Sequence, residues 1–463
     1  MNKILLATAL VSLMFVPACN EKPDNPNDEG NNGNIENETD PKYAGLVINE
    51  VAAHEDLDGI DTWIELVNPT SETKQLDGLD LYLTDSFIKG RSVSKLSGSL
   101  APGERLTLST ENESLRTGID PTKAFSIVLG TAANKSVSAF SVKDGENSLG
   151  YFGSWQRIPD GTGDFRLMTY DTKDKENKLF NLNDYYHNAV WVWGSHMSDL
   201  LDNDAAKLKN LKNLGYDHIL LNAAAFDNNN NHHNALRFVR RCQELDLVVH
   251  AWIQCFYNNG EWESPVDDEN KCYREETYER IRNNANRYLK EWGAKGLHLD
   301  YIRFGGTAYK HNPSADVTAI GAVNRCCREI REICDSFDEG MVTSAALMPE
   351  ANSEYYYGQV PSQMSKWIHI LMPMIYRYGG YNMNDNKFRS NSNYFATEAE
   401  KGGGVSWSGI QTYDANTKGM TAEQIRADID LMAETKCQGI VLFRYQLGTF
   451  PDVKDLWKQY NNQ

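Results

Sequence analysis

A regular alternation of short apolar runs and longer amphipathic segments, from residue 189 onward, most constrains the fold of this chain. The apolar runs lie at 189–196, 218–226, 247–256, 296–304, 341–348, 367–376, 404–413 and 437–445. Continuous apolar strands alternating with helices are typical of a parallel sheet that helices cover. Eight such units predict a (β/α)8 TIM barrel over 185–463. An open doubly wound sheet is the alternative, although no glycine-rich phosphate loop follows its first strand.

Residues 43–178 show a different pattern, with a period of two. Apolar and polar residues alternate in Leu46–Val51 and in Thr62–Val67, as they do in half-buried strands. Turn sequences such as Asp77-Gly78 and Pro102-Gly103 separate the candidate strands. Several short strands at this spacing predict a separate all-β sandwich domain before the barrel.

The N-terminus reads as an export signal. Lys3 precedes an apolar run at 4–16 that is too short to span a bilayer, and the segment ends at Cys19. Small residues followed by Cys19 resemble a bacterial lipoprotein signal, which implies a signal peptide at 1–19 and lipidation of Cys19. An ordinary cleaved signal peptide is the alternative. Residues 20–42 are polar and rich in Asn, Asp, Glu, Pro and Gly, so they predict a disordered tether.

Acidic residues soon after Cys19 resemble the surface-export signal of some Gram-negative lipoproteins. This similarity implies an outer-membrane lipoprotein exposed at the cell surface, with periplasmic residence as the alternative. The formal net charge of −18 argues against nucleic acid as a partner, because phosphate backbones require a basic face. The seven cysteines after Cys19 lack the CxxC pairs of a zinc site, so we expect structural thiols, no metal and no cofactor.

Polar and aromatic residues at the strand ends are the candidates for chemistry, because barrel enzymes work at the C-terminal ends of their strands. The segment 296–304 is the most informative, since it delivers Asp300 to the end of an apolar strand, where an unpaired charge is expensive. The candidate substrate-binding residues each lie at or near the C-terminal end of a predicted strand. They are Trp193, His196, Asn222, Trp252, Gln254, His298, Tyr301, Arg303, Tyr376, Gln411, Tyr413 and Arg444.

Asp300 and Glu350 form the candidate catalytic pair, because they fall at the ends of adjacent predicted strands and are expected to face one cleft. Glycosidic-bond cleavage commonly needs one carboxylate as nucleophile or base and one carboxylic acid as proton donor. Arg303 is expected either to keep Asp300 ionised or to form a salt bridge to a helix. Glu350 alternatively caps the helix that follows it, since helix N-termini favour acids. A wide separation of the pair would favour Asp227, Glu354 or Asp414 instead.

The first domain resembles the lamin-tail domain. The resemblance rests on 48–51 (Ile-Asn-Glu-Val), on 63–69 (Trp-Ile-Glu-Leu-Val-Asn-Pro) and on 155–165. It implies an immunoglobulin-like fold with an accessory or adhesion role. Glu50 and Glu65 offer oxygen atoms that a metal could bind, but cross-strand structural roles are the preferred interpretation.

The barrel resembles glycoside-hydrolase-like barrel domains in segments 296–304, 344–350, 373–376 and 439–445. Its fourth strand is more distantly similar to the α-amylase clan. That similarity implies Asp300 as nucleophile and Glu350 as acid/base. His298 departs from the clan's pattern, which has Arg there, and only Asp414 offers a third acid.

These observations predict a surface-anchored glycoside hydrolase that acts on an oligosaccharide or polysaccharide and is held to the membrane through Cys19. A non-catalytic glycan-binding or adhesion lipoprotein is the alternative. A metal-dependent hydrolase of phosphate or amide bonds is a third hypothesis, for which the strand ends offer only His196 and His298.

Overall fold

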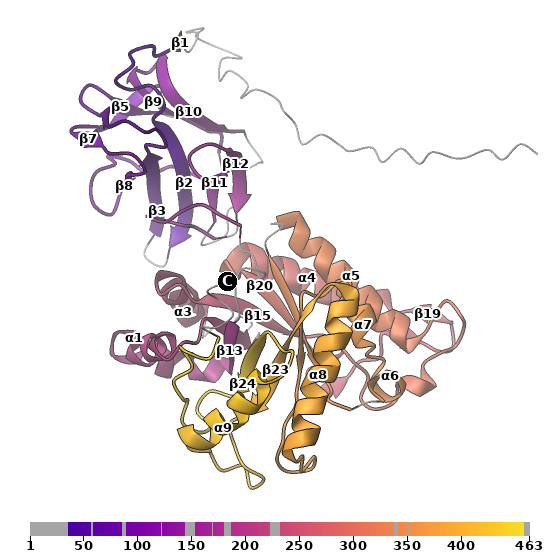
Figure 1. The fold of residues 1–463 in the computed structure, drawn as a ribbon. Helices are drawn as coiled ribbons and strands as arrows, with labels where there is room; N and C mark the ends of the chain where they lie inside the picture. Colours follow the sequence, from indigo (N-terminus) through magenta and orange to yellow (C-terminus); the bar gives the residue numbers. More distant parts are fainter. Residues whose placement is uncertain are drawn as a thin grey trace, which may run out of the picture.

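The computed structural model describes residues 36–56, 59–85, 89–121, 123–143, 153–168, 170–179, 187–222, 232–337, 341–350 and 352–457. A β-rich module, drawn in indigo and purple in Figure 1, precedes a barrel that continues to the yellow end of the chain. The predicted signal peptide at 1–19, Cys19 itself and residues 20–35 of the predicted tether lie outside the described residues. Within the described part of the chain, no helix combines the length and the apolar character that a membrane crossing needs.

The β module contains two five-stranded sheets, in the orders β1-β10-β9-β5-β6 and β12-β11-β2-β3-β8. One hydrophobic core draws Leu81 and Ile127 from the first sheet and Leu66 and Trp155 from the second. The immunoglobulin-like fold of this module stays a prediction. Its strands are β1 (Glu36–Asn37), β2 (Val47–Asp56), β3 (Gly59–Val67), β4 (Lys74–Gln75), β5 (Asp80–Asp85), β6 (Arg91–Lys95), β7 (Ser99–Leu100), β8 (Arg105–Ser109), β9 (Phe125–Ala132), β10 (Lys135–Val142), β11 (Ser154–Ile158) and β12 (Asp164–Met168).

The end of the predicted tether is ordered, so the prediction of disorder is wrong for residues 36–42. Strand β1 pairs in parallel with β10. The Glu38 carboxylate just after it accepts hydrogen bonds from the Thr39 N–H and from the Thr131 hydroxyl. These contacts to β9 and β10 hold the polar segment against the sheet. The composition of the segment alone does not predict such contacts.

A buried polar cluster explains the Asn-Glu pattern of β2. The Thr172 hydroxyl lies 2.7 Å from both Glu50 Oε2 and Asn177 Oδ1. Asn177 uses its Nδ2 to donate to the Asn49 carbonyl, so its Oδ1 is an acceptor and takes the one hydroxyl proton of Thr172. Glu50 Oε2 must then carry a proton and donate to Thr172. Burial raises the pKa of Glu50 to about 8, with a further contribution from the charge of Asp171. Glu50 is therefore a neutral structural acid.

The eight predicted apolar runs each overlap one strand of a closed parallel barrel, so the TIM-like barrel is confirmed. Strand β13 pairs with both β14 and β24, which closes the sheet and excludes the open doubly wound alternative. The barrel strands are β13 (His187–Val192), β14 (His218–Asn222), β15 (Val248–Gln254), β20 (Gly296–Asp300), β21 (Val342–Leu347), β22 (Ile370–Pro373), β23 (Val405–Gln411) and β24 (Gly439–Phe443).

Helices cover the outside of the barrel in the order expected from the alternation (Figure 1). They are η2 (Gly194–His196), α1 (Met197–Asn213), α3 (His232–Glu244), α4 (Glu275–Trp292), η3 (Ala308–Lys310), α5 (Ala319–Phe337), α6 (Ser353–Tyr357), α7 (Pro361–Met364), α8 (Asp385–Gly402) and α9 (Ala422–Ala433). Two short hairpins, β16–β17 (Tyr257–Asn258 and Glu261–Trp262) and β18–β19 (Val266–Asp267 and Cys272–Tyr273), follow β15. All seven cysteines after Cys19 are free thiols, and six of them are buried.

Side chains fill the interior of the barrel, so it is a packed core rather than a pore. Trp191, Trp252, Met372 and Trp407 belong to one buried cluster inside the ring of strands. A ligand can therefore reach only the two ends of the barrel. The C-terminal end, called the mouth below, carries the predicted site, and the N-terminal end is called the base.

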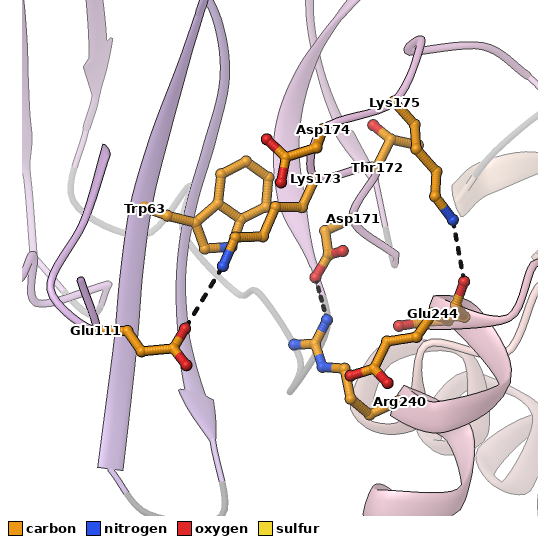
Figure 2. A pocket seen from close by; sticks show the side chains of 10 residues that line it. Trp63, Glu111, Asp171, Thr172, Lys173, Asp174, Lys175, Arg240 and Glu244 are labelled. Atoms are coloured by element: carbon orange, nitrogen blue, oxygen red, sulfur yellow. Dashed lines mark hydrogen bonds and ion pairs between the residues drawn. The ribbon is translucent and has the colours of Figure 1, made fainter. Parts of the chain in front are cut away.

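The β module contacts the barrel across a charged cleft of about 400 Å³ (Figure 2). Arg240 on α3 donates to Asp171 at 2.6 Å, and Lys173 lies 3.8 Å from Glu111. Trp63 lines the same cleft. Its cations thus face acids of the cleft itself, which suits a junction between two folded units.

This junction lies toward the base of the barrel. Lys175 of the module forms an ion pair with Asp246, which precedes β15, and Lys295, which precedes β20, places its ammonium 4.3 Å from the Tyr170 ring. Residues that precede parallel strands share one end of a barrel. The module is therefore at the end opposite to the mouth.

Candidate active site at the barrel mouth

Asp300 is the last residue of β20 and remains partly exposed at the mouth. Its two carboxylate oxygens each accept a hydrogen bond: Oδ2 from the indole N–H of Trp252 at 2.9 Å, and Oδ1 from the backbone N–H of Tyr301 at 2.7 Å. Burial raises the pKa of Asp300, and the Tyr301 N–H, the charge of Arg303 and the Trp252 N–H oppose that rise. The donors hold an oriented carboxylate.

Tyr301 and Arg303 form one wall beside Asp300. Tyr301 has a φ of +49°, a left-handed conformation that is uncommon for an aromatic residue and occurs where a site constrains the backbone. Its ring stacks on Tyr257 at 4.6 Å. The Arg303 guanidinium lies 4.8 Å from the Trp262 ring and 5.5 Å from the Tyr357 ring. Arg303 thus contributes positive charge from among aromatic rings, and within the described part of the chain it makes no ion pair with a helix, which was the alternative.

Glu350 follows β21 and is held by two tyrosines. Its Oε1 accepts hydrogen bonds from the Tyr381 hydroxyl at 3.0 Å and the Tyr357 hydroxyl at 3.4 Å. Its Oε2 is buried and has no hydrogen-bond partner among the described residues. The Ser353 N–H at the start of α6 bonds to the backbone carbonyl of Glu350, not to its side chain. The alternative that Glu350 caps this helix is therefore wrong.

Shared neighbours place the two acids around one mouth. The charge of Arg303 lowers the pKa of Asp300 and also opposes the raised pKa of Tyr381, which bonds Glu350. Burial raises the pKa of Tyr376, and Tyr413, Asp300 and Tyr381 lie close enough to raise it further. Tyr376, whose ring stacks on Phe443 at 5.5 Å, is thus near Asp300 and near Tyr381, the tyrosine that bonds Glu350.

A second group of predicted residues forms the opposite rim. Trp193 is 43% exposed and meets Trp252 edge to face at 6.2 Å. The Arg444 guanidinium lies 5.1 Å from the Trp193 ring. Because Trp252 also bonds Asp300, this rim connects directly to the acid. Trp252 itself is only 4% exposed, so it positions Asp300 rather than offering a stacking face.

Two further predicted substrate-binding residues, His298 and Gln411, use their side chains in hydrogen bonds inside the protein. His298 is fully buried, accepts from the Trp191 indole N–H at 3.0 Å and contacts the Ser344 hydroxyl at 2.9 Å with its other ring nitrogen. Gln411 is 2% exposed; its Oε1 accepts from the Tyr378 N–H and its Nε2 donates to the Tyr413 carbonyl. His298 thus lies in the packed interior, whereas Gln411 turns its amide to the loops that follow β22 and β23.

The remaining candidates lie at or close to the C-terminal ends of the strands. Asn222 is buried at the end of β14, and Gln254 is partly exposed at the end of β15, in register with Asp300. Tyr413 is partly exposed. His196 packs its ring 5.9 Å from that of Tyr445, and burial together with the Arg444 charge lowers its pKa.

The structure describes two of the three acids that were the alternatives in the sequence analysis, Asp414 and Glu354. Asp414 accepts from the Asn416 and Lys418 N–H groups with one oxygen, so it closes a turn. Glu354 is exposed on α6. Asp227 lies outside the described residues.

Four residues of the site were missed by the sequence interpretation: Trp262, Tyr357, Gln359 and Tyr381. Gln359 is buried and joins the two acid-bearing loops, since its Nε2 donates to the carbonyls of Ile302 and Ala346 while its Oε1 accepts from the Met348 N–H. These residues come from a short hairpin strand, a short helix and two loops, where no periodic pattern marks them. The only sequence signal was the density of aromatic residues in 355–357 and 376–381.

No family model matches the sequence, and no curated protein matches it. Similar solved structures include the glycoside hydrolase domain of PgaB from Bordetella bronchiseptica, at 12% identity and a TM-score of 0.42, covering 56% of this chain and 94% of that one. A β-galacturonidase from Eisenbergiella tayi has 14% identity and a TM-score of 0.36, covering 87% and 65%. The spore cortex-lytic enzyme SleL from Bacillus megaterium has 14% identity and a TM-score of 0.40, covering 63% and 75%. At these values the likeness concerns the fold alone.

Proposed function

We propose that this protein hydrolyses glycosidic bonds in a complex glycan, with Asp300 and Glu350 as the reacting carboxyl groups. The observation that carries the proposal is their complementary hydrogen bonding. Both oxygens of Asp300 accept N–H donors, an environment that fits an ionised base or nucleophile. Glu350 has one oxygen fixed by two tyrosines and a buried second oxygen without a partner among the described residues.

That second oxygen, Oε2, suits a proton donor. A protonated Oε2 has a proton to give and no protein acceptor among the described residues, so the oxygen of a glycosidic bond would complete its hydrogen bonding. Glu350 would protonate the leaving sugar while Asp300 attacks the anomeric carbon or activates water. Arg303 would hold Asp300 in its ionised form, because its charge opposes the effect of burial on the pKa of Asp300.

The aromatic rim supports a sugar as the substrate. Trp193 beside Trp252 and Trp262 beside Arg303 are 43% and 44% exposed, and Tyr381 is 38% exposed where it bonds Glu350. Exposed flat rings are expensive to leave in water and stack well on the apolar faces of sugars. Their spread around the mouth suits an oligosaccharide or polysaccharide rather than a single sugar.

The placement of the β module supports surface display. If Cys19 is lipidated, the anchor precedes a module that contacts the base of the barrel. The mouth would then face away from the membrane. The lamin-tail-like module would act as a spacer in this arrangement, and not as a contact for substrate at the mouth.

A screen for turnover of an oligosaccharide library tests the proposal. The wild-type protein is expected to release products from at least one glycan, and Asp300→Asn and Glu350→Gln are expected to lower the rate at least about 100-fold. Asp414→Asn is the matched control, since Asn keeps the oxygen that closes its turn at the same end of the barrel. Turnover that persists in both variants would overturn the assignment of the acids.

A non-catalytic glycan-binding role is the second candidate, and the same exposed rings favour it. It predicts glycan affinity in the wild type with no turnover, and affinity that survives Asp300→Asn and Glu350→Gln but falls in Trp193→Ala. Calorimetric titration with the same library separates the two functions.

A further inference from the structure

A cluster of histidines at the base of the barrel has no part in the proposed hydrolysis. His187, His218 and His250 begin or enter three consecutive strands, β13, β14 and β15, and all are buried. His218 contacts His250 Nε2 through its Nδ1 and His187 Nδ1 through its Nε2, both at 2.9 Å. The Asp217 carboxylate lies 3.0 Å from His187 Nδ1. Three potential metal-ligand atoms, His187 Nδ1, His218 Nε2 and Asp217 Oδ2, therefore lie close together.

Only one proton lies among the three atoms His187 Nδ1, His218 Nε2 and Asp217 Oδ2 when the histidines are neutral. If His218 Nε2 donated to His187 Nδ1, the lone pair of His187 would face the Asp217 carboxylate, which is repulsive. The neutral arrangement instead has a single proton on His187 Nδ1, shared between Asp217 Oδ2 and His218 Nε2. His218 then donates from Nδ1 to His250. One proton thus serves three groups, each of which can bind a cation through the same atom.

The spacing of these atoms fits a metal ion. The distances are 2.9 Å for His187–His218, 3.0 Å for His187–Asp217 and 4.0 Å for His218–Asp217. A point equidistant from all three lies about 2.0 Å from each, which matches the bond lengths of transition metals to imidazole nitrogen and carboxylate oxygen. An ion at that point would see angles of about 90° between His187 and each of the other two ligand atoms. The angle between His218 and Asp217 would be about 170°. These angles are typical of tetragonal rather than tetrahedral coordination.

We propose that His187, His218 and Asp217 form a binding site for a first-row divalent transition metal, with Cu²⁺ or Ni²⁺ favoured over Zn²⁺. Metal-binding histidines commonly use the second ring nitrogen in a hydrogen bond that fixes the tautomer, and His250 supplies that bond for His218. The Asn188 N–H orients Asp217 through its other oxygen at 2.9 Å. The 24% exposure of the Asp217 side chain gives the ion a route from solvent.

The surroundings set the expected strength and role. Lys212 and Lys295 lie near this cluster, and their positive charges oppose the binding of a dication. We therefore expect weaker binding than at a site of the same ligands without these charges. Since the three donors come from β13, from β14 and from the residue before it, a bound ion would cross-link the first two strands of the barrel. The site would be structural and independent of the acids at the mouth.

Titration of tag-free, EDTA-treated full-length protein with Cu²⁺, Ni²⁺ and Zn²⁺ tests this site. We expect one Cu²⁺ or Ni²⁺ per chain, a raised melting temperature, and an electron paramagnetic resonance spectrum of the Cu²⁺ form with coupling to two nitrogens. Asp217→Asn keeps the oxygen that bonds Asn188 and should lower the affinity at least about tenfold. Asp268→Asn is the control, because Asp268 pairs with a single histidine, His311.

Three results would overturn the proposal: no stoichiometric binding of any of the ions, equal affinity in Asp217→Asn, or a Cu²⁺ spectrum without nitrogen coupling. The spectrum is measured on the wild type, so it decides the question even if a variant folds poorly. The histidines would then form a proton-sharing ladder only.

Discussion

The protonated state of Glu50 leads to a stability prediction that can be worked out quantitatively. Burial raises the pKa of Glu50 from its usual 4.5 to about 8. The folded module then holds a proton that the unfolded chain releases, so the stability from this group is complete below pH 4.5 and is lost as pH rises toward 8. At about 1.4 kcal/mol per pH unit, the interval between the two values gives at most about 5 kcal/mol.

Glu50→Gln should remove this dependence. Its amide can donate to the Thr172 hydroxyl as the protonated acid does, and its oxygen can accept from Ser154 and from the Thr172 N–H. We expect the variant to match the wild type near pH 4.5 and to exceed it by about 2–5 kcal/mol at pH 8 and above. Hydrogen exchange of peptides from β2, corrected for the intrinsic effect of pH, measures this within the intact chain.

Glu72→Gln is the control for that experiment, since the Glu72 side chain is 80% exposed in the same module. Its stability profile should follow that of the wild type. Parallel profiles for Glu50→Gln and the wild type would refute the reasoning, because they would mean that Glu50 is ionised in the folded state across this range.

Three further predictions concern the mouth. Trp252→Phe removes a hydrogen-bond donor that lowers the pKa of Asp300. The acidic limb of the kcat/KM profile against pH requires ionised Asp300, so it should move to higher pH. An acidic limb that does not move would contradict this prediction. Tyr381→Phe removes the shorter hydrogen bond to Glu350 and should cost about 1.5 kcal/mol, or roughly tenfold in kcat, with little change in KM. Gln359→Ala leaves buried carbonyls without a hydrogen-bond donor. It should lower the unfolding free energy, measured by urea titration, by about 1–3 kcal/mol, and it should also lower kcat. Unchanged values of both would show that Gln359 does not hold the two loops.

The barrel could be predicted from the sequence because its strands are continuous apolar runs separated by amphipathic helices. Closure follows from eight units, and it places Asp300 and Glu350 after adjacent strands. The position of Asp300 at the mouth follows from its place at the end of β20. These features depend on the number and order of apolar runs and amphipathic segments, which a single sequence shows directly.

Depth within the barrel could not be read in the same way. His298 and Asp300 share one face of β20, two residues apart, yet His298 lies in the packed interior and Asp300 at the mouth. Gln411 likewise ends a strand but turns its amide to the neighbouring loop. The partners of Glu350 come from α6 and from the loop after β22, so only tertiary packing brings Tyr357 and Tyr381 to it.

Chemical rescue of Asp300→Gly by azide tests most directly whether Asp300 is the carboxylate that reacts at the anomeric carbon. With a glycan identified by the turnover screen, the variant should be folded and inactive alone. Added azide should restore turnover and give a product that carries azide in place of the leaving sugar. Wild-type turnover without azide, or a folded variant that azide does not rescue, would contradict the role assigned to Asp300.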